Sequence, residues 1–203
     1  MNIVIIGLGV IGGGYAMALR EAGYTEVYGV DSNITTLEKA KVLGIIKEGC
    51  LTGESVIPKA DLVILAVYPD LVKEFIRNNI KLFKDGLIIT DVTGIKEPFI
   101  EEVTEILPEN IDFVFGHPMA GREKKGIDYA TNTVFKGANY LITVTPKNKE
   151  ENIELIQELA YKMGFKKVKK ISPKYHDEMI AFTSQLPHAL AVALINSDIE
   201  GRD

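Results

Sequence analysis

The feature that most constrains the fold of this chain is a glycine-rich turn directly behind its first apolar segment. Residues 2–6 have the composition of a buried strand, and Gly7, Gly9 and Gly12 follow at once. Residues 10–22 then have the composition of a helix. A strand that leads through such a turn into a helix is the opening of a βαβ unit, which builds parallel sheets. The turn therefore predicts an α/β fold.

The same alternation of apolar runs and amphipathic stretches continues along most of the chain. Further strands are expected at residues 26–30, 45–46, 61–67, 86–90, 113–115, 139–144 and 166–171. Helices are expected at residues 33–43, 70–80, 96–106 and 149–163. Helices that connect successive parallel strands cover both faces of the sheet. We therefore predict a doubly wound, Rossmann-type sheet domain that spans residues 1–170.

Residues 171–203 follow a different pattern. Ser172 and Pro173 predict the start of a new helix, as an N-cap residue followed by proline. Apolar residues then recur at three- and four-residue spacings, and Pro187 is expected to kink or split the helix. The apolar side chains of such a helix are expected to pack against the sheet domain, against another chain or against a following segment. We interpret residues 171–203 as the truncated start of an all-helical C-terminal domain.

Composition narrows the class of partner. The net charge of −5 argues against nucleic acid as the main partner, because binding phosphates needs a basic face. A single cysteine, Cys50, excludes an internal disulfide and is typical of a reducing cytoplasm. No uninterrupted apolar run reaches about 18 residues, so no membrane-spanning segment is expected. We therefore expect a cytoplasmic protein without nucleic-acid or membrane partners.

The glycine turn also has the spacing of a dinucleotide-binding fingerprint. Gly7 permits the tight turn, Gly9 lets backbone amides approach a pyrophosphate, and Gly12 allows close helix–strand packing. Unpaired amides at the start of the helix attract the phosphates. Asp31, at the end of the second strand, is suited to bind ribose hydroxyls and to repel a 2′-phosphate, which favours NAD over NADP. A glycine turn without a ligand is the alternative interpretation.

The remaining cofactor contacts are expected at the carboxyl ends of the strands, where open α/β sheets bind their ligands. The predicted residues, besides the three glycines and Asp31, are Leu8, Val10, Ile11, Ala66, Val67, Tyr68 and Thr93. For residues 66–69 a plain strand-to-helix turn is the alternative.

His117 is the candidate for the chemical step. It closely follows the strand at residues 113–115, in a segment with glycines at 116, 121 and 126 and several charged residues. An imidazole that titrates near neutrality is suited to accept the proton of an alcohol during hydride transfer. A turn residue beside Pro118 is the alternative. The three histidines of the chain lack the spacing of ligands on one helix, so no metal site is expected.

Several motifs together resemble those of the prephenate dehydrogenase family. They are Gly7-x-Gly9-x-x-Gly12, the Thr-Asp-Val-Thr-Gly-Ile-Lys segment at 90–96, Gly116-His117-Pro118-Met119-Ala120-Gly121-x-Glu123-Lys124-x-Gly126, His176-Asp177 and Leu186-Pro187-His188. The likeness runs from Met1 to about Asn196. It implies NAD(P)-dependent oxidative decarboxylation of prephenate to 4-hydroxyphenylpyruvate, or conversion of arogenate to tyrosine, in tyrosine biosynthesis.

The resemblance also implies roles for single residues. His117 matches the catalytic histidine that hydrogen-bonds the ring hydroxyl of the substrate, and Glu123, His176 and His188 match residues of the substrate pocket. Lys124 is expected beside them. The family commonly has Gly-Ser where this chain has Thr93-Gly94, so the Thr93 hydroxyl is expected to orient the substrate from one residue earlier.

The chain departs from the family pattern in ways that affect the substrate site. Gln185 replaces the first histidine of a His-Leu-Pro-His motif. Family members continue into a helical dimerisation domain that carries an arginine for a substrate carboxylate, which implies a homodimer through the C-terminal helices. The cations left near the site are Lys96, Arg122, Lys124 and Lys125. Lys96 is otherwise interpreted as a solvated lysine. We expect the 203-residue chain to bind NAD and to turn over substrate poorly.

Two other classes of protein remain open at this point. A β-hydroxyacid dehydrogenase or a pyrroline carboxylate reductase shares the glycine turn and an apolar helical tail, and differs in the segment around His117. A non-catalytic NAD-binding module is the other. Prephenate and arogenate differ by a keto or an amino group on the side chain, and the sequence does not distinguish between these two substrates.

Overall fold

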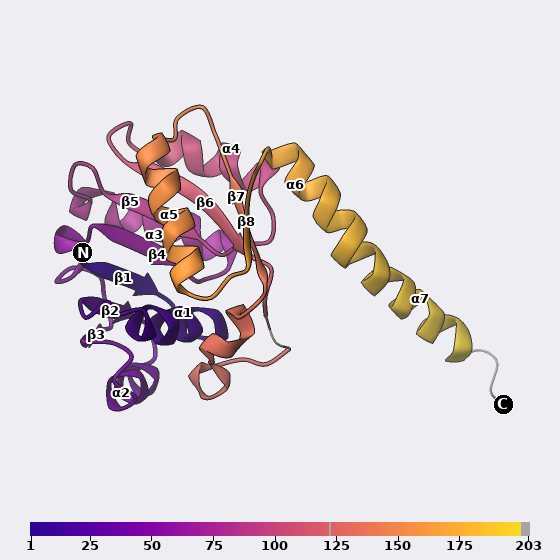
Figure 1. Cartoon of the computed structure of the whole chain (residues 1–203), viewed down its shortest axis with the longest axis horizontal. Helices are drawn as coiled ribbons and strands as arrows, with labels where there is room; N and C mark the ends of the chain where they lie inside the picture. The colour runs from indigo at the N-terminus through magenta and orange to yellow at the C-terminus, as the bar shows by residue number, and fades with distance from the viewer. Residues whose placement is uncertain (122, 200–203) are drawn as a thin grey trace.

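The computed structural model of the chain describes residues 1–121 and 123–199, and shows a three-layer α/β domain from which one long helix projects (Figure 1). The central sheet has eight strands in the order β3-β2-β1-β4-β5-β6-β7-β8. The strands are β1 (Ile3–Ile6), β2 (Val27–Val30), β3 (Glu48–Cys50), β4 (Leu62–Leu65), β5 (Ile88–Asp91), β6 (Asp112–Pro118), β7 (Asn139–Thr143) and β8 (Lys167–Ile171). The predicted doubly wound α/β class is confirmed.

Seven α-helices occur in the described part of the chain. They are α1 (Val10–Glu21), α2 (Ile34–Val42), α3 (Pro69–Asn79), α4 (Glu97–Ile106), α5 (Glu150–Lys162), α6 (Pro173–Ile180) and α7 (Leu186–Ile199). Short 3₁₀ turns lie at η1 (Ile57–Lys59), η2 (Ile80–Leu82), η3 (Ile127–Tyr129) and η4 (Asn132–Phe135), and a π-helical turn, η5 (Ala181–Gln185), separates α6 from α7.

Two apolar cores sandwich the sheet, because successive side chains of a strand point to opposite faces. In β1, Ile3 and Ile5 face one core together with side chains of α1, α2 and α5. Val4 and Ile6 face the other, with side chains of α3 and α4. All four residues of β1 are buried, which explains why this strand is an uninterrupted apolar run.

The order of the strands creates a ligand-binding crevice. Strand β1 pairs with β2 on one edge and with β4 on the other. The chain therefore builds the sheet outward from one edge of β1 through β2 and β3, and then crosses to the other edge with β4. At such a switch point the connections on the two sides diverge, and a crevice opens beyond the carboxyl ends of the strands. The glycine turn lies at this point.

The third strand was predicted at residues 45–46 and lies instead at Glu48–Cys50, where it pairs with Tyr28–Val30. The amide of Ile45 donates to the carbonyl of Ala40 in the turn that ends α2. Ile45 and Ile46 are buried in the core without belonging to the sheet. A short apolar pair has the same composition in a buried turn as in a strand, which is why the prediction was wrong.

The sixth strand is longer than predicted and changes the character of the sheet. Its first half pairs in parallel with β5, and its second half, Phe115–Pro118, pairs antiparallel with β7. The sheet is therefore mixed rather than wholly parallel. His117 and Pro118 lie inside β6, so the interpretation of His117 as a residue past the end of the strand is wrong.

The C-terminal helices leave the domain as one projecting rod (Figure 1). The hydroxyl of Ser172 accepts from the amide of Tyr175, which confirms the predicted cap. Pro187 was expected to kink or split the helix, but the rod is not split. It continues through a π-helical turn, Ala181–Gln185, directly before Leu186 and Pro187, where proline removes one backbone donor. The large apolar side chains of the rod are exposed, and they are Phe182, Leu186, Leu190, Val192, Leu194 and Ile195.

In the described part of the chain, the segment Pro173–Ser197 is long and apolar enough to cross a membrane by length and composition: an 18-residue stretch within it has a mean hydropathy of 1.3, and 6% of that stretch is buried. The expectation from uninterrupted apolar runs alone did not foresee this. An apolar helix that packs against other helices has the same composition as a bilayer span of this length.

Candidate active site

A cleft of about 550 Å³ opens at the carboxyl ends of the central strands. Its walls come from the glycine turn and from the segments that follow β4, β5 and β6. The lining residues are Gly9, Val10, Ile11, Ala66, Val67, Tyr68, Pro69, Val92, Thr93, Gly94, Ala120, Gly121, Lys124, Lys125 and Gly126. The structure thus brings together four segments that are far apart in the sequence, each of which contributes residues predicted to bind cofactor or substrate.

The glycine turn is shaped by two close backbone approaches. Gly7 has φ +86°, in the left-handed region that favours glycine. A Cβ at Gly12 would lie 1.9 Å from the carbonyl oxygen of Gly7, so no side chain fits there. At Gly9, which precedes α1, a Cβ would meet no atom within 4 Å, and no side chain caps the helix. Gly9 and the free amides of α1 therefore form an open cradle that suits a pyrophosphate.

Asp31 lies at the far side of the glycine turn. One carboxylate oxygen accepts from the amide of Leu8 at 2.8 Å, and the other accepts from the amide of Asn33 at 2.9 Å. Each oxygen keeps a lone pair for a ligand hydroxyl. Asp31 and Gly7 line a second cleft of about 410 Å³, and Val67 borders both clefts. A dinucleotide that bridges the two clefts would cross the glycine turn at its middle.

His117 lies on β6 behind the wall of the larger cleft. A Cβ at Gly94 would lie 3.5 Å from Cε1 and Nε2 of the imidazole, and Gly94 lines the cleft. Nδ1, on the other side of the ring, lies 2.9 Å from Nε2 of His176. His117 therefore presents Nε2 on the side of the cleft and Nδ1 toward α6.

His176 does not line the cleft, although the family resemblance implies a place in the substrate pocket. Its side chain is completely buried behind His117. Its Nδ1 lies 2.7 Å from an oxygen of Asp177. Asp177 also accepts from the backbone amides of Lys96 at 2.9 Å and Glu97 at 2.8 Å, which ties α6 to the start of α4.

Burial is the main cause of a lowered pKa at His117. It brings the pKa from the ordinary 6.5 to about 3, and the positive charge of Lys96 acts in the same direction. The neighbouring His176 lowers it further, whereas the negative charge of Asp177 opposes the shift. Burial also lowers the pKa of His176. Both imidazoles are therefore neutral at physiological pH, and His117 is a hydrogen-bond acceptor rather than a cation.

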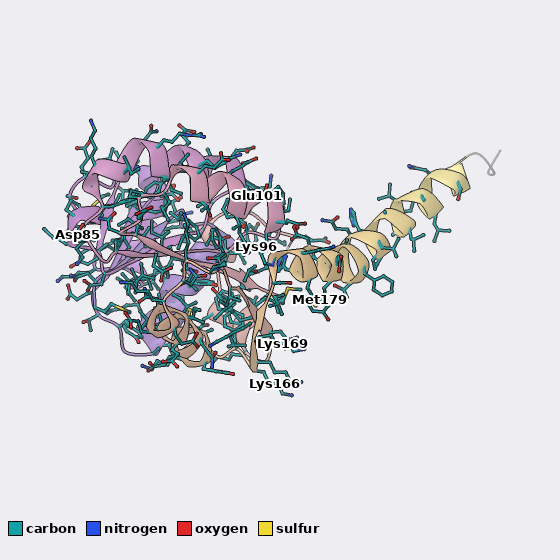
Figure 2. The ribbon with its side chains drawn as sticks, turned by 90° about the horizontal axis from the view of Figure 1, so that it is seen from above. Asp85, Lys96, Glu101, Lys166, Lys169 and Met179 are labelled. Atoms are coloured by element: carbon teal, nitrogen blue, oxygen red, sulfur yellow. The ribbon has the colours of Figure 1, made fainter. Side chains whose placement is uncertain are left out.

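Lys96 was expected to be solvated or to serve as a cation for the substrate, and both expectations are wrong. Its side chain is completely buried, and its ammonium donates to a carboxylate oxygen of Asp91 at 2.6 Å and to the carbonyl of Thr93 at 2.9 Å. Figure 2 shows Lys96 close to the point where α6 leaves the sheet domain. A lysine held this way has no free donor direction toward the cleft.

Thr93 borders the cleft, and its hydroxyl bonds to buried groups of the domain. Oγ1 bonds to a carboxylate oxygen of Asp91 and lies 3.0 Å from the Lys96 ammonium. Asp91 uses its other oxygen to accept from the amide of Gly116 at 3.0 Å, directly before His117. Asp91 therefore organises the ends of both β5 and β6.

The other predicted residues are less closely placed. Lys124 and Lys125 line the cleft, and the Lys124 ammonium lies 4.7 Å from the ring centroid of Tyr129. Glu123 is exposed in the same segment, and His188 is exposed on the projecting rod. The prediction for Arg122 lies outside the described residues. Among the described residues, no cluster of histidine, cysteine and carboxylate side chains suits a metal ion.

Two functional residues were missed by reasoning from the sequence, although both belong to quoted motifs. Asp91 ends β5 as Asp31 follows β2, and that position was the available signal. Asp177 is adjacent to His176, but its contact with Lys96 joins residues 81 positions apart, which no local pattern reveals.

Acidification is expected to lower the free energy of unfolding as the pH falls from 6.5 toward 3. In this window the unfolded chain protonates His117 at its ordinary pKa of 6.5, whereas the folded chain does so only at about 3. The unfolded state therefore binds more protons and gains stability relative to the native state. Above pH 6.5 the residue contributes no slope.

Urea unfolding at a series of pH values measures this dependence. His117→Asn is expected to show a shallower decline between pH 6.5 and 3 than the unchanged chain. His176 and Asp177 keep part of the slope in both proteins, because a lowered carboxyl pKa also favours the native state at higher pH. Identical slopes in the two proteins would contradict the lowered pKa.

The chain was compared with known protein families and structures. The family profile described as "Prephenate dehydrogenase, nucleotide-binding domain" matches residues 15–169, which is more than half of the chain. The prephenate dehydrogenase of Bacillus subtilis is 29% identical over 96% of this chain, which corresponds to 53% of that relative. The chain therefore spans about half the length of the curated relatives it matches.

Solved structures agree with the sequence comparison. Prephenate dehydrogenase from Aquifex aeolicus, in complex with hydroxyphenyl propionate and NAD+, aligns with a TM-score of 0.91 at 31% identity, over 100% of this chain and 71% of that one. Synechocystis arogenate dehydrogenase aligns with a TM-score of 0.88 at 29% identity, over 100% of this chain and 71% of that chain. Pyrroline-5-carboxylate reductase from Coxiella burnetii, at 16% identity and a TM-score of 0.72, shares the fold alone. By its sequence profile and these likenesses, this chain belongs to the prephenate dehydrogenase family.

Proposed function

We propose that this chain binds NAD and takes part in the oxidative decarboxylation of prephenate to 4-hydroxyphenylpyruvate. The observation that carries this proposal is the position of a neutral histidine, His117, directly behind Gly94 in the wall of a cleft that begins at a dinucleotide turn. The named relatives, which are prephenate, cyclohexadienyl and arogenate dehydrogenases, support it.

The proposed reaction does not require a strong general base. The carbinol carbon of the substrate loses a hydride, and the ring carboxylate leaves as CO₂ while its bond electrons make the ring aromatic. NAD, when bound, supplies the nicotinamide carbon that accepts the hydride. The product is a phenol, so the substrate hydroxyl ends the reaction with its proton, and the reaction releases no net proton.

His117 therefore acts by polarising the substrate rather than by removing a proton for good. Its neutral Nε2 accepts a hydrogen bond from the hydroxyl and stabilises the positive charge that develops as the carbon–oxygen bond gains double-bond character. A pKa of about 3 suits this role, because the imidazole stays an acceptor and does not trap the proton. Lys124 and Lys125 at the cleft are the described cations suited to a substrate carboxylate.

The residues around the glycine turn fit NAD. Gly9 leaves open space before α1, and Asp31 offers carboxylate lone pairs to the two ribose hydroxyls while its charge repels a 2′-phosphate. The remaining predicted cofactor residues, Leu8, Val10, Ile11, Ala66, Val67, Tyr68 and Thr93, belong to the turn or to the wall of the cleft.

Two glycine variants separate cofactor binding from folding. Gly9→Ala is expected to leave the free energy of unfolding within about 1 kcal/mol of its original value, because the added Cβ meets nothing within 4 Å. The same methyl group points at the pyrophosphate cradle and is expected to weaken NAD binding by about tenfold or more. Gly12→Ala is expected to impair both, since its Cβ would lie 1.9 Å from the Gly7 oxygen.

Calorimetric titration of NAD and urea unfolding of the three proteins give these two quantities. Unchanged NAD affinity in Gly9→Ala would contradict the placement of the pyrophosphate at this turn.

We further propose that residues 1–170 form the NAD-binding domain and residues 171–203 begin a helical domain through which two copies pair. The exposed apolar side chains of the projecting rod support this, as does the alignment of the whole chain with the solved relatives. In this proposal the apolar helix Pro173–Ser197 packs against protein rather than lipid, and the protein works in the cytoplasm.

Formation of NADH from prephenate or from arogenate tests the proposed reaction. The two assays are run on the 203-residue chain and on an extended form, in which the remaining C-terminal part of a full-length relative is fused after Asp203. We expect prephenate-dependent NADH in the extended form and little in the shorter one. Turnover of arogenate alone would assign the other substrate, and turnover of neither by the extended form would contradict the proposal.

A further inference from the structure

Asp177 is held as a carboxylate at the junction of α6 and α4. Its oxygens accept from the amides of Lys96 and Glu97 at the start of α4, where the helix dipole favours a negative charge. Burial raises the pKa of Asp177, but the hydrogen bonds from Glu97, His176 and Lys96 outweigh it, and the pKa is lowered overall. Asp177 is thus ionised at neutral pH, and an ionised carboxylate only accepts hydrogen bonds.

The direction of the next two hydrogen bonds follows from this. Because Asp177 only accepts, Nδ1 of His176 carries the hydrogen of their 2.7 Å contact. A neutral imidazole with a hydrogen on Nδ1 has a bare Nε2. Nε2 of His176 therefore accepts, and Nδ1 of His117 donates across the 2.9 Å between the two rings. That leaves Nε2 of His117 without a hydrogen, on the side of the ring that lies by Gly94 and the cleft.

We propose that Asp177 and His176 are positioning residues that hold His117 in its Nδ1–H tautomer, so that Nε2 faces the substrate hydroxyl as an acceptor. The catalytic consequence rests on the proposed function, but the tautomer does not. The opposite orientation of the chain of hydrogen bonds would require a proton on Asp177 and would turn His117 into a donor toward the cleft.

The surroundings leave the imidazoles few other partners. His176 is completely buried, and its two ring nitrogens have the contacts just described. The charged groups that face the pair are the Lys96 ammonium, Asp91 and Asp177. Lys96 is itself bonded to Asp91 and Thr93. The hydrogen-bonded series Asp177–His176–His117, called the relay below, therefore begins in the first turns of α6. The helix that leaves the domain thus also orients the catalytic histidine.

The tautomers are measured on the 203-residue chain by long-range proton–nitrogen NMR of ¹⁵N-labelled histidine, which distinguishes a protonated from a bare ring nitrogen. Single histidine variants assign the signals. We expect His117 and His176 to show protonated Nδ1 and bare Nε2 at neutral pH. A protonated Nε2 on His117 in the unchanged protein would overturn the proposal.

Two variants test the relay. His176→Phe keeps the ring volume and removes both hydrogen bonds. Asp177→Ala removes the terminal acceptor, and with it the acceptors of the Lys96 and Glu97 amides. Each is expected to shift His117 toward the Nε2–H tautomer that free imidazole prefers. Ser172→Ala is the matched control, since it weakens the cap of the same helix without touching the relay. An unchanged tautomer in the variant that folds would overturn the proposal, as would an equal shift in Ser172→Ala.

The kinetic readout separates this inference from the proposed function. In the extended form, His176→Phe is expected to lower kcat by roughly 10² or more with little change in KM, as a wrong tautomer does in other enzymes. Tautomers as expected without turnover of prephenate or arogenate would contradict the proposed function and leave the relay standing. Tautomers as expected with unchanged kcat in His176→Phe would overturn the positioning role.

Discussion

Replacing His117 with asparagine is expected to lower the rate of prephenate turnover by about 10²–10⁴-fold while leaving the affinity for NAD unchanged. Asparagine has no acceptor at the position of the imidazole Nε2, which lies on the side of the ring near Gly94 and the cleft. The predicted NAD-binding residues lie on other segments, at the glycine turn and after β2, β4 and β5. The loss should therefore appear in catalysis alone.

Steady-state NADH formation in the extended form and NAD titration of the same variant make this comparison. The titration is the internal control for folding of the cleft. Prephenate turnover within threefold of the unchanged enzyme, about 0.7 kcal/mol in the barrier, would remove His117 from the reaction.

Replacing Asp91 with alanine is expected to lower the free energy of unfolding by about 3–5 kcal/mol. Asp91 and Lys96 are both completely buried, so the variant leaves an ammonium without its counter-charge. It also removes the acceptors of the Thr93 and Gly116 amides, which hold the ends of β5 and β6 in place. Urea unfolding measures the change.

The matched control is Asp128→Ala, which breaks an ion pair with Lys39 whose side chains are 64% and 46% exposed. Solvent screens such a pair, so the expected loss is below about 1 kcal/mol. The double variant Asp91→Leu with Lys96→Met is expected to recover part of the loss, because it removes both charges. Equal losses in Asp91→Ala and Asp128→Ala would contradict the structural importance of the buried pair.

The parts of the fold that could be predicted from the sequence are those that local patterns determine. The strand at the N-terminus, the glycine turn and Asp31 follow one another within one βαβ unit, and the structure has them as predicted. The cap at Ser172 and the irregular helical turn before Pro187 are equally local. In each case the chemistry of a few neighbouring residues decides the conformation.

The parts that could not be predicted depend on contacts between distant segments. The direction of β7 relative to β6 is set by the path of the connection between them, not by the composition of either strand. Lysine is usually found at the surface. Lys96 is buried because its ammonium pairs with Asp91 and because α6 packs over it, through a contact with Asp177, 81 positions later in the sequence. His176 is also buried through contacts between distant segments. It therefore lies behind His117, not in the substrate pocket where it was expected.

The transfer of deuterium from the carbinol carbon of prephenate tests the central claim most directly. Prephenate labelled at that carbon is incubated with NAD and the extended form, and the deuterium in the reduced cofactor is compared with the CO₂ released. The account predicts equal amounts of deuterated cofactor and CO₂, and the loss of both in His117→Asn. Release of CO₂ without labelled cofactor, or labelled cofactor without CO₂, would contradict it.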